Sequence, residues 1–317
     1  MTPEVVQRYR VPRNRVWLVR SRRLSNAAAP KITIIGCGTP TPTPEAFGSS
    51  HLIEVGSGEK LLFDCGPATT HKLAKAGVPV TDIHKVIFTH HHFDHDSDFP
   101  TFVLSRWDQL VPTDIPLDVY GPPPTAKFCS GMLDEPDGLF VHDWIARVNH
   151  PGSMVTFVDR GGVLPRAKPV LVPHEIGIGT FLETDEYKIT AARAEHVQPY
   201  LDSLAYRVDT DGGSVVITGD TRPCESVTEL ARGADSLMMM CWESHDHVGG
   251  TDHDLATCSI RGAAETAAAA GVRQLVMVHI GARLRNPEMA EARAREAESA
   301  FDGEIVWGEE LMQVSAP

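Results

Sequence analysis

The chain has 317 residues, of which 42% are hydrophobic and 22% charged, a composition typical of a globular protein with a full core. Lys and Arg total 29 against 42 Asp and Glu, so the formal net charge is −13, which argues against binding nucleic acid or anionic membranes by bulk electrostatics. The apolar runs are as long as strands and shorter than the ~20 residues of a membrane-spanning helix, so no membrane contact is expected. Histidine is abundant, with 15 residues, four of them within positions 90–95.

Positive charge is concentrated at the N-terminus. Residues 1–30 hold seven Arg and one acid, so this segment carries +6 and the rest of the chain −19. No apolar signal-peptide core follows Arg22 and Arg23, so we interpret the segment as a basic arm that packs on the acidic body or on a second subunit of a homodimer. The six Cys are far apart and form no C-x-x-C pair, as in a cytoplasmic protein with reduced thiols.

Strand-like runs alternate with turn signals from residue 31 onward. In the first half we predict strands over 31–35, 49–55, 60–63, 85–89 and 117–121, and a helix over 70–76. Residues 125–180 show no clear periodicity. In the second half we predict strands over 181–195, 236–241 and 274–279, a hairpin over 203–218, and helices over 263–270 and 286–302. This alternation predicts a layered α/β protein, and in both halves strands end at His and Asp residues.

The predicted strand 85–89 leads into a dense cluster of His and Asp, which reads Thr-His-His-His-Phe-Asp-His-Asp over residues 89–96. At the end of a strand, His90 and His92 point to the same side because side chains alternate, while Asp94 and His95 lie where the chain turns. Imidazole nitrogen and carboxylate oxygen are ligands of Zn²⁺ and related ions. The segment therefore predicts two ligands for each of two metal ions, and its apolar lead-in disfavours a chance, solvated His run.

The pattern His90-x-His92-x-Asp94-His95 resembles the signature of the metallo-β-lactamase superfamily. Its surroundings resemble the ribonuclease Z and arylsulfatase-like branch of that superfamily. The likeness covers nearly all of residues 31–317 and is also carried by the sequences at 36–40, 62–66, 195–196, 218–221 and 278–279. It implies an α/β fold in which residues 31–317 form a hydrolase domain. This would be an αββα sandwich of two mixed sheets flanked by helices, with the active site at one edge.

The resemblance also implies a set of seven metal ligands. His90, His92 and His196 would hold one ion, Asp94, His95 and His279 the other, and Asp220 would bridge the two. Taken alone, Asp220 also fits a turn cap, and His279 also fits a buried core histidine. Asp64 is expected to orient a ligand His rather than to bind metal itself. The two divalent ions are expected to be Zn²⁺, although Mn²⁺ or Fe also suits this donor set.

Two such ions would activate a bridging water as hydroxide and clamp the substrate, with Asp94 orienting the nucleophile. A poor leaving group would also need a proton. In the ribonuclease Z branch a His in an H-x-T element helps to supply it, whereas residues 257–259 here read Thr-Cys-Ser. The nearby His245, His247 and His253 are candidate proton donors, although their polar segment equally fits an exposed loop.

Three functions remain open from the sequence. The missing His and the acidic body favour hydrolysis of a small ester-like molecule: an aryl sulfate, phosphodiester, lactone or activated aromatic. Trp107 and Trp242 are candidates for stacking an aromatic substrate, although core packing is the favoured role of each. The second function is tRNA 3′-end processing, for which only the N-terminal arm offers a basic surface. The third is a non-catalytic metal-binding protein of the same fold. We therefore expect a small-molecule substrate and disfavour nucleic acid.

Overall fold

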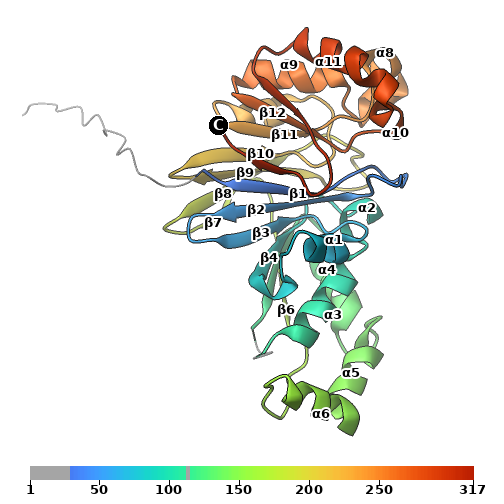
Figure 1. The fold of residues 1–317 in the computed structure, drawn as a ribbon, viewed down its shortest axis with the longest axis vertical. Helices are drawn as coiled ribbons and strands as arrows, with labels where there is room; N and C mark the ends of the chain where they lie inside the picture. Colours follow the sequence, from blue (N-terminus) through green and yellow to red (C-terminus); the bar gives the residue numbers. More distant parts are fainter. Residues whose placement is uncertain (1–28, 112–114) are drawn as a thin grey trace, which may run out of the picture.

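The computed structural model of the protein describes residues 29–111 and 115–317. Within these ranges the strands form two seven-stranded sheets that lie face to face, with helices on both outer faces (Figure 1). The αββα sandwich expected from the sequence is therefore confirmed. No helix in the described ranges is long and apolar enough to cross a bilayer.

The first sheet has the order β14-β1-β2-β3-β4-β5-β6 and mixes antiparallel and parallel pairs. Its strands are β1 (Lys31–Cys37), β2 (Ser49–Val55), β3 (Glu59–Phe63), β4 (Ile83–Ile87), β5 (Leu117–Gly121), β6 (Leu171–Glu175) and β14 (Gln313–Ser315). The second sheet has the order β13-β12-β11-β10-β9-β8-β7 and is parallel from β10 to β13. Its strands are β7 (Gly179–Glu183), β8 (Tyr187–Arg193), β9 (Leu204–Thr210), β10 (Gly213–Ile217), β11 (Ser236–Met240), β12 (Gln274–Val278) and β13 (Glu304–Trp307).

The helices divide between the two outer faces. Over the first sheet lie α1 (Thr69–Lys75), α3 (Phe99–Gln109), α4 (Thr125–Leu133) and α5 (Val141–Asn149), and α6 (Pro151–Asp159) packs on α5. Over the second lie α7 (Glu225–Ala231), α9 (Ile260–Ala270) and α11 (Ala290–Glu298). The described residues also form six shorter elements: η1 (Val80–Asp82), α2 (Phe93–Asp96), α8 (His245–Val248), η2 (Asp252–Leu255), α10 (Ala282–Arg285) and η3 (Pro287–Met289).

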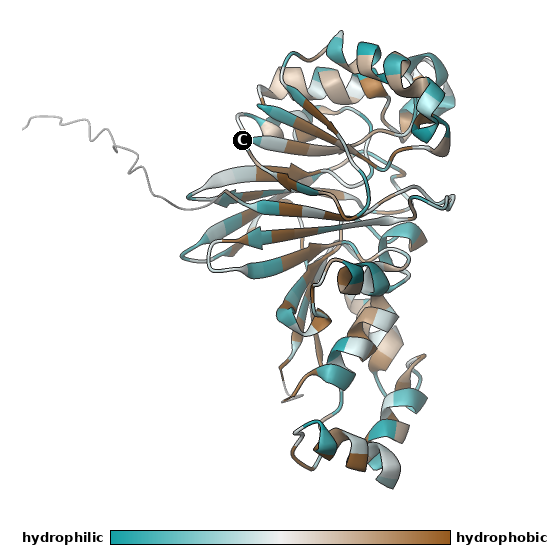
Figure 2. Ribbon diagram, in the orientation of Figure 1, coloured by the Kyte–Doolittle hydropathy of each residue, from teal (hydrophilic) through white to brown (hydrophobic). Residues whose placement is uncertain are grey.

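Apolar side chains between the sheets hold the sandwich together. Ile32 and Ile34 of β1 and Phe63 of β3 belong to the same buried cluster as Tyr206 and Val208 of β9. The rings of Phe63 and Tyr206 are 5.8 Å apart at an angle of 50°. Since helices cover the other faces, central strands such as β1 are buried on both sides, which explains their nearly continuous apolar sequences. In Figure 2 the strands are hydrophobic in their central parts and hydrophilic toward one end, while the outer helices carry residues of both kinds.

The structure differs from the sequence prediction in several elements. The predicted strand 181–195 is a hairpin of β7 and β8, because the Thr184 hydroxyl accepts hydrogen bonds from the backbone N–H groups of Glu186 and Tyr187. The predicted helix 286–302 contains a short 3₁₀ turn (Pro287–Met289), capped by the Asn286 side chain, before α11. Residues 125–180, which had no readable pattern, form α4, α5, α6 and β6.

The basic arm predicted over residues 1–30 lies almost entirely in residues 1–28, outside the described residues. Its packing on the acidic body and its part in a homodimer therefore stay predictions.

Candidate metal centre

The predicted ligands meet at one edge of the sandwich because the strands that carry them end there. β4 ends at Ile87 and leads through Thr89 and His90 into α2, which carries Asp94. The chain reaches the other predicted ligands after β8, β10 and β12, which run in the same direction in the second sheet. The carboxyl ends of strands from both sheets thus converge, as the resemblance implied. His90 and His92 lie beyond β4 rather than on it.

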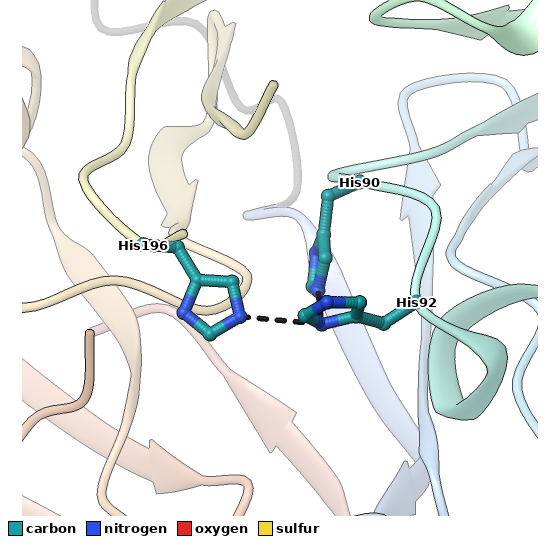
Figure 3. Close-up of side chains that lie close together, drawn as sticks. All are labelled: His90, His92 and His196. Carbon is teal, nitrogen blue, oxygen red and sulfur yellow. Dashed lines mark hydrogen bonds between the residues drawn. The ribbon is translucent and has the colours of Figure 1, made fainter. Parts of the chain in front are cut away.

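Three imidazoles form one half of the centre (Figure 3). His92 Nδ1 lies 3.1 Å from His90 Nε2 and 3.2 Å from His196 Nε2. The three facing nitrogens all lie within 4.8 Å of one another, close enough to ligate a single ion. His90 and His92 come from the loop after β4 and His196 from the loop after β8, so residues 104 positions apart meet here.

Carboxylates and imidazoles form the other half. Asp94 Oδ2 lies 3.2 Å from His279 Nε2 and 3.6 Å from His95 Nε2. Asp220 faces both halves: its Oδ1 is 3.3 Å from the Nε2 atoms of His95 and His279, and its Oδ2 is 3.8 Å from His196 Nε2. Asp220 therefore lies between the two halves of the centre.

The chemistry of these donors fits metal binding. Within the described part of the chain, His95 Nε2 and Asp220 Oδ1 are buried side-chain atoms with no hydrogen-bond partner, although a buried polar atom normally has one. Burial, reinforced by the neighbouring His95, holds the pKa of His90 well below its usual value. Burial alone would raise the pKa of Asp220, but His279 and His95 outweigh it and hold the pKa well below its usual value. Ionised carboxylate and neutral imidazole are the forms that bind divalent ions. Burial alone would lower the pKa of His95, but the carboxylates of Asp64 and Asp220 outweigh it and hold the pKa well above its usual value, so a metal ion would have to displace a proton there.

Asp64 orients His95 by a hydrogen bond, as expected from the sequence. Its Oδ2 accepts a hydrogen bond of 2.7 Å from His95 Nδ1, which leaves Nε2 free to face the centre. Its Oδ1 accepts another of 2.7 Å from the backbone N–H of Thr89. Two residues on, Gly66 is required, because a Cβ there would lie 2.1 Å from the carbonyl oxygen of Asp94.

Two features of the support had no recognisable sequence signal. The backbone carbonyl of Ala256 accepts a 2.6 Å hydrogen bond from His196 Nδ1 and so aims Nε2 at the centre. Asp64 and His279 have φ of 59° and 52°, in the left-handed region that non-glycine residues rarely adopt. Such strain is typical of functional sites, where the surrounding structure holds residues in unfavourable conformations.

His91, the histidine of the run that was not predicted as a ligand, has a structural role. The Thr125 hydroxyl donates to the Pro122 carbonyl at 2.7 Å, so it accepts from His91 Nε2 at 2.8 Å. His91 Nδ1 lies 3.1 Å from Asp96 Oδ2. His91 therefore ties the ligand-bearing turn to the start of α4. Side-chain alternation, which places His91 opposite His90 and His92, was the available signal.

The three candidate proton donors lie outside the ligand groups found among the described residues. His245 Nδ1 is 3.3 Å from Ser259 Oγ, and a Cβ on Gly249 would lie 2.5 Å from the His245 ring. His247 and His253 are exposed and stack at a centroid distance of 5.7 Å. His253 also lies 4.7 Å from the Trp242 ring.

Of the two tryptophans considered for substrate stacking, Trp107 belongs to the core. It is 3% exposed and donates its indole N–H to the Ala167 carbonyl. Arg166 covers its ring at 4.0 Å, so no face of this indole is left for a substrate.

Comparison with known proteins identifies the family. Ribonuclease Z of Mycobacterium bovis (strain BCG / Pasteur 1173P2) is 31% identical over 291 residues, covering 90% of this chain and 97% of that protein. Ribonuclease Z of Mycobacterium marinum is 32% identical over 290 residues, covering 90% of this chain and 98% of that protein. The chain belongs to the ribonuclease Z family of the metallo-β-lactamase superfamily.

Two family models each match part of the chain, and solved structures match its fold. The "Beta-lactamase superfamily domain" matches residues 142–280, and the family "Anti-Pycsar protein Apyc1" matches residues 30–106. The metallo-β-lactamase fold protein YhfI from Bacillus subtilis superposes with a TM-score of 0.69 at 20% identity, covering 90% of this chain and 99% of that chain. The short form of human tRNase Z gives 0.64 at 20% identity, with the same coverage. These structural likenesses show the fold.

Membership of this family establishes the enzyme class and corrects one expectation. The protein is a metal-dependent hydrolase of the metallo-β-lactamase fold, not a non-catalytic metal-binding protein. The expectation of a small-molecule substrate, with nucleic acid disfavoured, is wrong, because relatives matching 90% of the chain are ribonucleases. The net charge of −13 misled because it sums the whole chain, whereas a substrate contacts only the surface around the site.

Proposed function

We propose that this protein hydrolyses phosphodiester bonds in RNA and acts as a tRNA 3′-processing endonuclease of the ribonuclease Z type. The observation that carries the proposal is the 31% identity to a ribonuclease Z over 97% of that protein's length. The geometry supports it, because Asp94, Asp220 and the surrounding imidazoles form two adjoining sets of donors at one edge of the sheets. Two adjacent divalent ions are a recurring device for hydrolysing phosphodiesters.

The resident ions are proposed to be two Zn²⁺. One is assigned to the three imidazoles of Figure 3 and the other to Asp94, His95 and His279, with Asp220 shared between them. When bound, such ions lower the pKa of a water molecule and neutralise charge that develops on the attacked phosphate.

The protein's own groups prepare this site before substrate arrives. Asp64 and the Ala256 carbonyl fix the ring orientation of His95 and His196, so that the ligand nitrogens need no reorganisation. Asp94 keeps one carboxylate oxygen facing His279 and His95. We assign to this carboxylate the orientation of the attacking nucleophile.

A proton donor for the leaving ribose oxygen is proposed from the segment after β11. Since residues 257–259 lack the His of the H-x-T element, the candidates are His245, His247 and His253. Exposure favours His247 and His253, because a general acid must exchange protons with solvent in each turnover. His253 comes first, since it lies three residues before Ala256, whose carbonyl touches ligand His196.

The test is cleavage of a precursor tRNA with a short 3′ trailer by the zinc-loaded, full-length protein. We expect the wild type to release the trailer and to leave a 3′-hydroxyl on the tRNA. Asp94→Ala removes both a ligand and the proposed orienting carboxylate, and it is expected to lose activity about 10³-fold or more. The proposal fails if the wild type leaves precursor tRNA intact while hydrolysing bis(p-nitrophenyl) phosphate, since that result would show a working centre with another substrate.

A further inference from the structure

Large apolar side chains are exposed next to the metal centre. Phe93 is 58% exposed, Tyr200 91% and Leu255 65%. We call these three residues the apolar rim. Phe93 stands between two predicted ligands, Tyr200 follows His196 by four residues, and Leu255 immediately precedes Ala256. Four residues of chain span at most ~14 Å, so the chain keeps Tyr200 close to the edge that carries the ligands.

Folding does not account for this exposure. In α2 the three polar residues Asp94, His95 and Asp96 are buried while the aromatic Phe93 faces solvent, which reverses the usual preference. Tyr200 sits in a turn closed by its backbone N–H on the Val197 carbonyl, and its ring contributes little packing. Exposed apolar groups on segments that border a polar site are typical of ligand-binding surfaces.

Charged groups near the same edge are already engaged within the protein. Arg222, close to His196 in the structure, donates its Nε–H to Glu195 at 2.8 Å. Arg283 donates its Nε–H to Glu243 at 3.0 Å. These two pairings reduce the positive charge that Arg222 and Arg283 offer to phosphates, so stacking on bases would add to binding where these two side chains do not.

Resting on the proposed function, we infer that the apolar rim binds unpaired nucleobases on either side of the scissile phosphodiester, with bases stacking on Phe93 and Tyr200 and packing on Leu255. Stacking suits this surface because every base has an aromatic face, whatever the sequence. Bases within a duplex are stacked on one another and present no free face. Beyond the proposed function, this assigns base stacking beside the scissile bond to Phe93 and Tyr200.

The experiment compares the zinc-loaded wild type with Phe93→Ala, Tyr200→Ala and the double variant on precursor tRNA. We expect each single change to raise KM about 5- to 100-fold, the effect of losing one stacked base, with zinc content and kcat at saturating RNA retained. Phe93→Trp and Tyr200→Phe keep an aromatic face and should restore KM. Val163→Ala is the matched control, because Val163 is 82% exposed but lies in the segment after α6.

A second arm changes the RNA instead of the protein, so its effect on the wild type does not depend on how a substitution folds. Precursor RNA with abasic nucleotides flanking the cleavage site should raise KM for the wild type as much as the double variant does. Abasic RNA should cost the double variant nothing further. If the wild type cleaves precursor RNA and both arms leave KM unchanged, the inference is overturned and the proposed function stands. If the wild type cleaves no RNA, the proposed function itself fails, and the inference with it.

Discussion

The predicted ligands and Asp64, which we call the floor of the metal centre, differ in burial from the apolar rim. At the floor, His90, Asp94 and His95 are buried, and Asp64 holds His95 by a hydrogen bond of 2.7 Å. At the rim, Phe93 and its partners are exposed and make few contacts. Many hydrolases share one fold. Their catalytic residues are buried, whereas the exposed residues around the site can differ between proteins and so determine the substrate. This division predicts that floor changes affect metal binding and turnover, whereas rim changes affect KM.

The largest effect is expected from Asp220→Asn. The substitution keeps the shape of the side chain but removes the negative charge from a group that lies 3.3 Å from His95 and His279 and 3.8 Å from His196. Bound zinc should fall from two ions per chain to one or fewer, and RNA cleavage should fall about 10³-fold or more. Elemental analysis after gel filtration and single-turnover cleavage measure the two effects.

Asp118→Asn is the matched control for this change, because Asp118 also pairs with a histidine, His174, at 2.9 Å but on the β5–β6 pair. It should retain two zinc ions and full activity. Two tightly bound zinc ions in Asp220→Asn would show that this carboxylate does not join the two halves of the floor.

The second largest effect is expected from the proton donor. If His253 protonates the leaving ribose oxygen, His253→Gln should lower kcat for RNA about 10²-fold. It should leave zinc content unchanged and spare bis(p-nitrophenyl) phosphate, whose nitrophenolate leaves without a proton. His247→Gln and His245→Gln, assayed alongside, show which of the three carries the role. Equal losses on both substrates would contradict proton donation and would place His253 in the floor instead.

The sequence alone predicts the floor far better than the rim, for a physical reason. The motif places four predicted ligands within residues 90–95, so spacing and residue type suffice to indicate a metal site. Asp220 and His279 are ambiguous in the sequence, and only convergence of their strands brings them within 3.3 Å. The sequence predicts that Asp64 orients a histidine of the motif, and its hydrogen bond to His95 agrees with this prediction.

Other contacts of the site could not be predicted from the sequence, because no residue type or spacing indicates them. The group that orients His196 is the carbonyl of Ala256, and every residue has a carbonyl. His91 meets Thr125 across 34 residues, in a stretch where recurring Pro and Gly obscured α4 to α6. The identity of the substrate was misjudged because net charge describes the whole chain, whereas the rim depends on the exposure of particular side chains.

An intermediate effect is expected from Asp64→Asn, which weakens the support of the floor without removing a ligand. The amide is a poorer acceptor for His95 Nδ1 than the carboxylate, so His95 loses both orientation and basicity. Zinc affinity should fall about 10- to 100-fold, and activity should recover when zinc is added in excess. Competition with a chromogenic chelator measures the affinity. A loss of activity that excess zinc does not restore would mean that Asp64 acts in the reaction itself.

The smallest effect on turnover is expected from His91→Leu, because His91 supports the floor only through the backbone of the turn. The change removes the His91 partner of the buried Asp96 carboxylate and one of the two hydrogen bonds of the Thr125 hydroxyl, which still donates to the Pro122 carbonyl. We expect a cost of about 1–3 kcal/mol in the free energy of unfolding. The zinc-loaded variant should keep kcat within about threefold. His174→Leu removes the half-exposed pair with Asp118 and should cost less than about 1 kcal/mol. Urea unfolding gives the free energy of unfolding of both variants. Equal losses in this free energy would show that the contacts of His91 stabilise the protein no more than the half-exposed pair does.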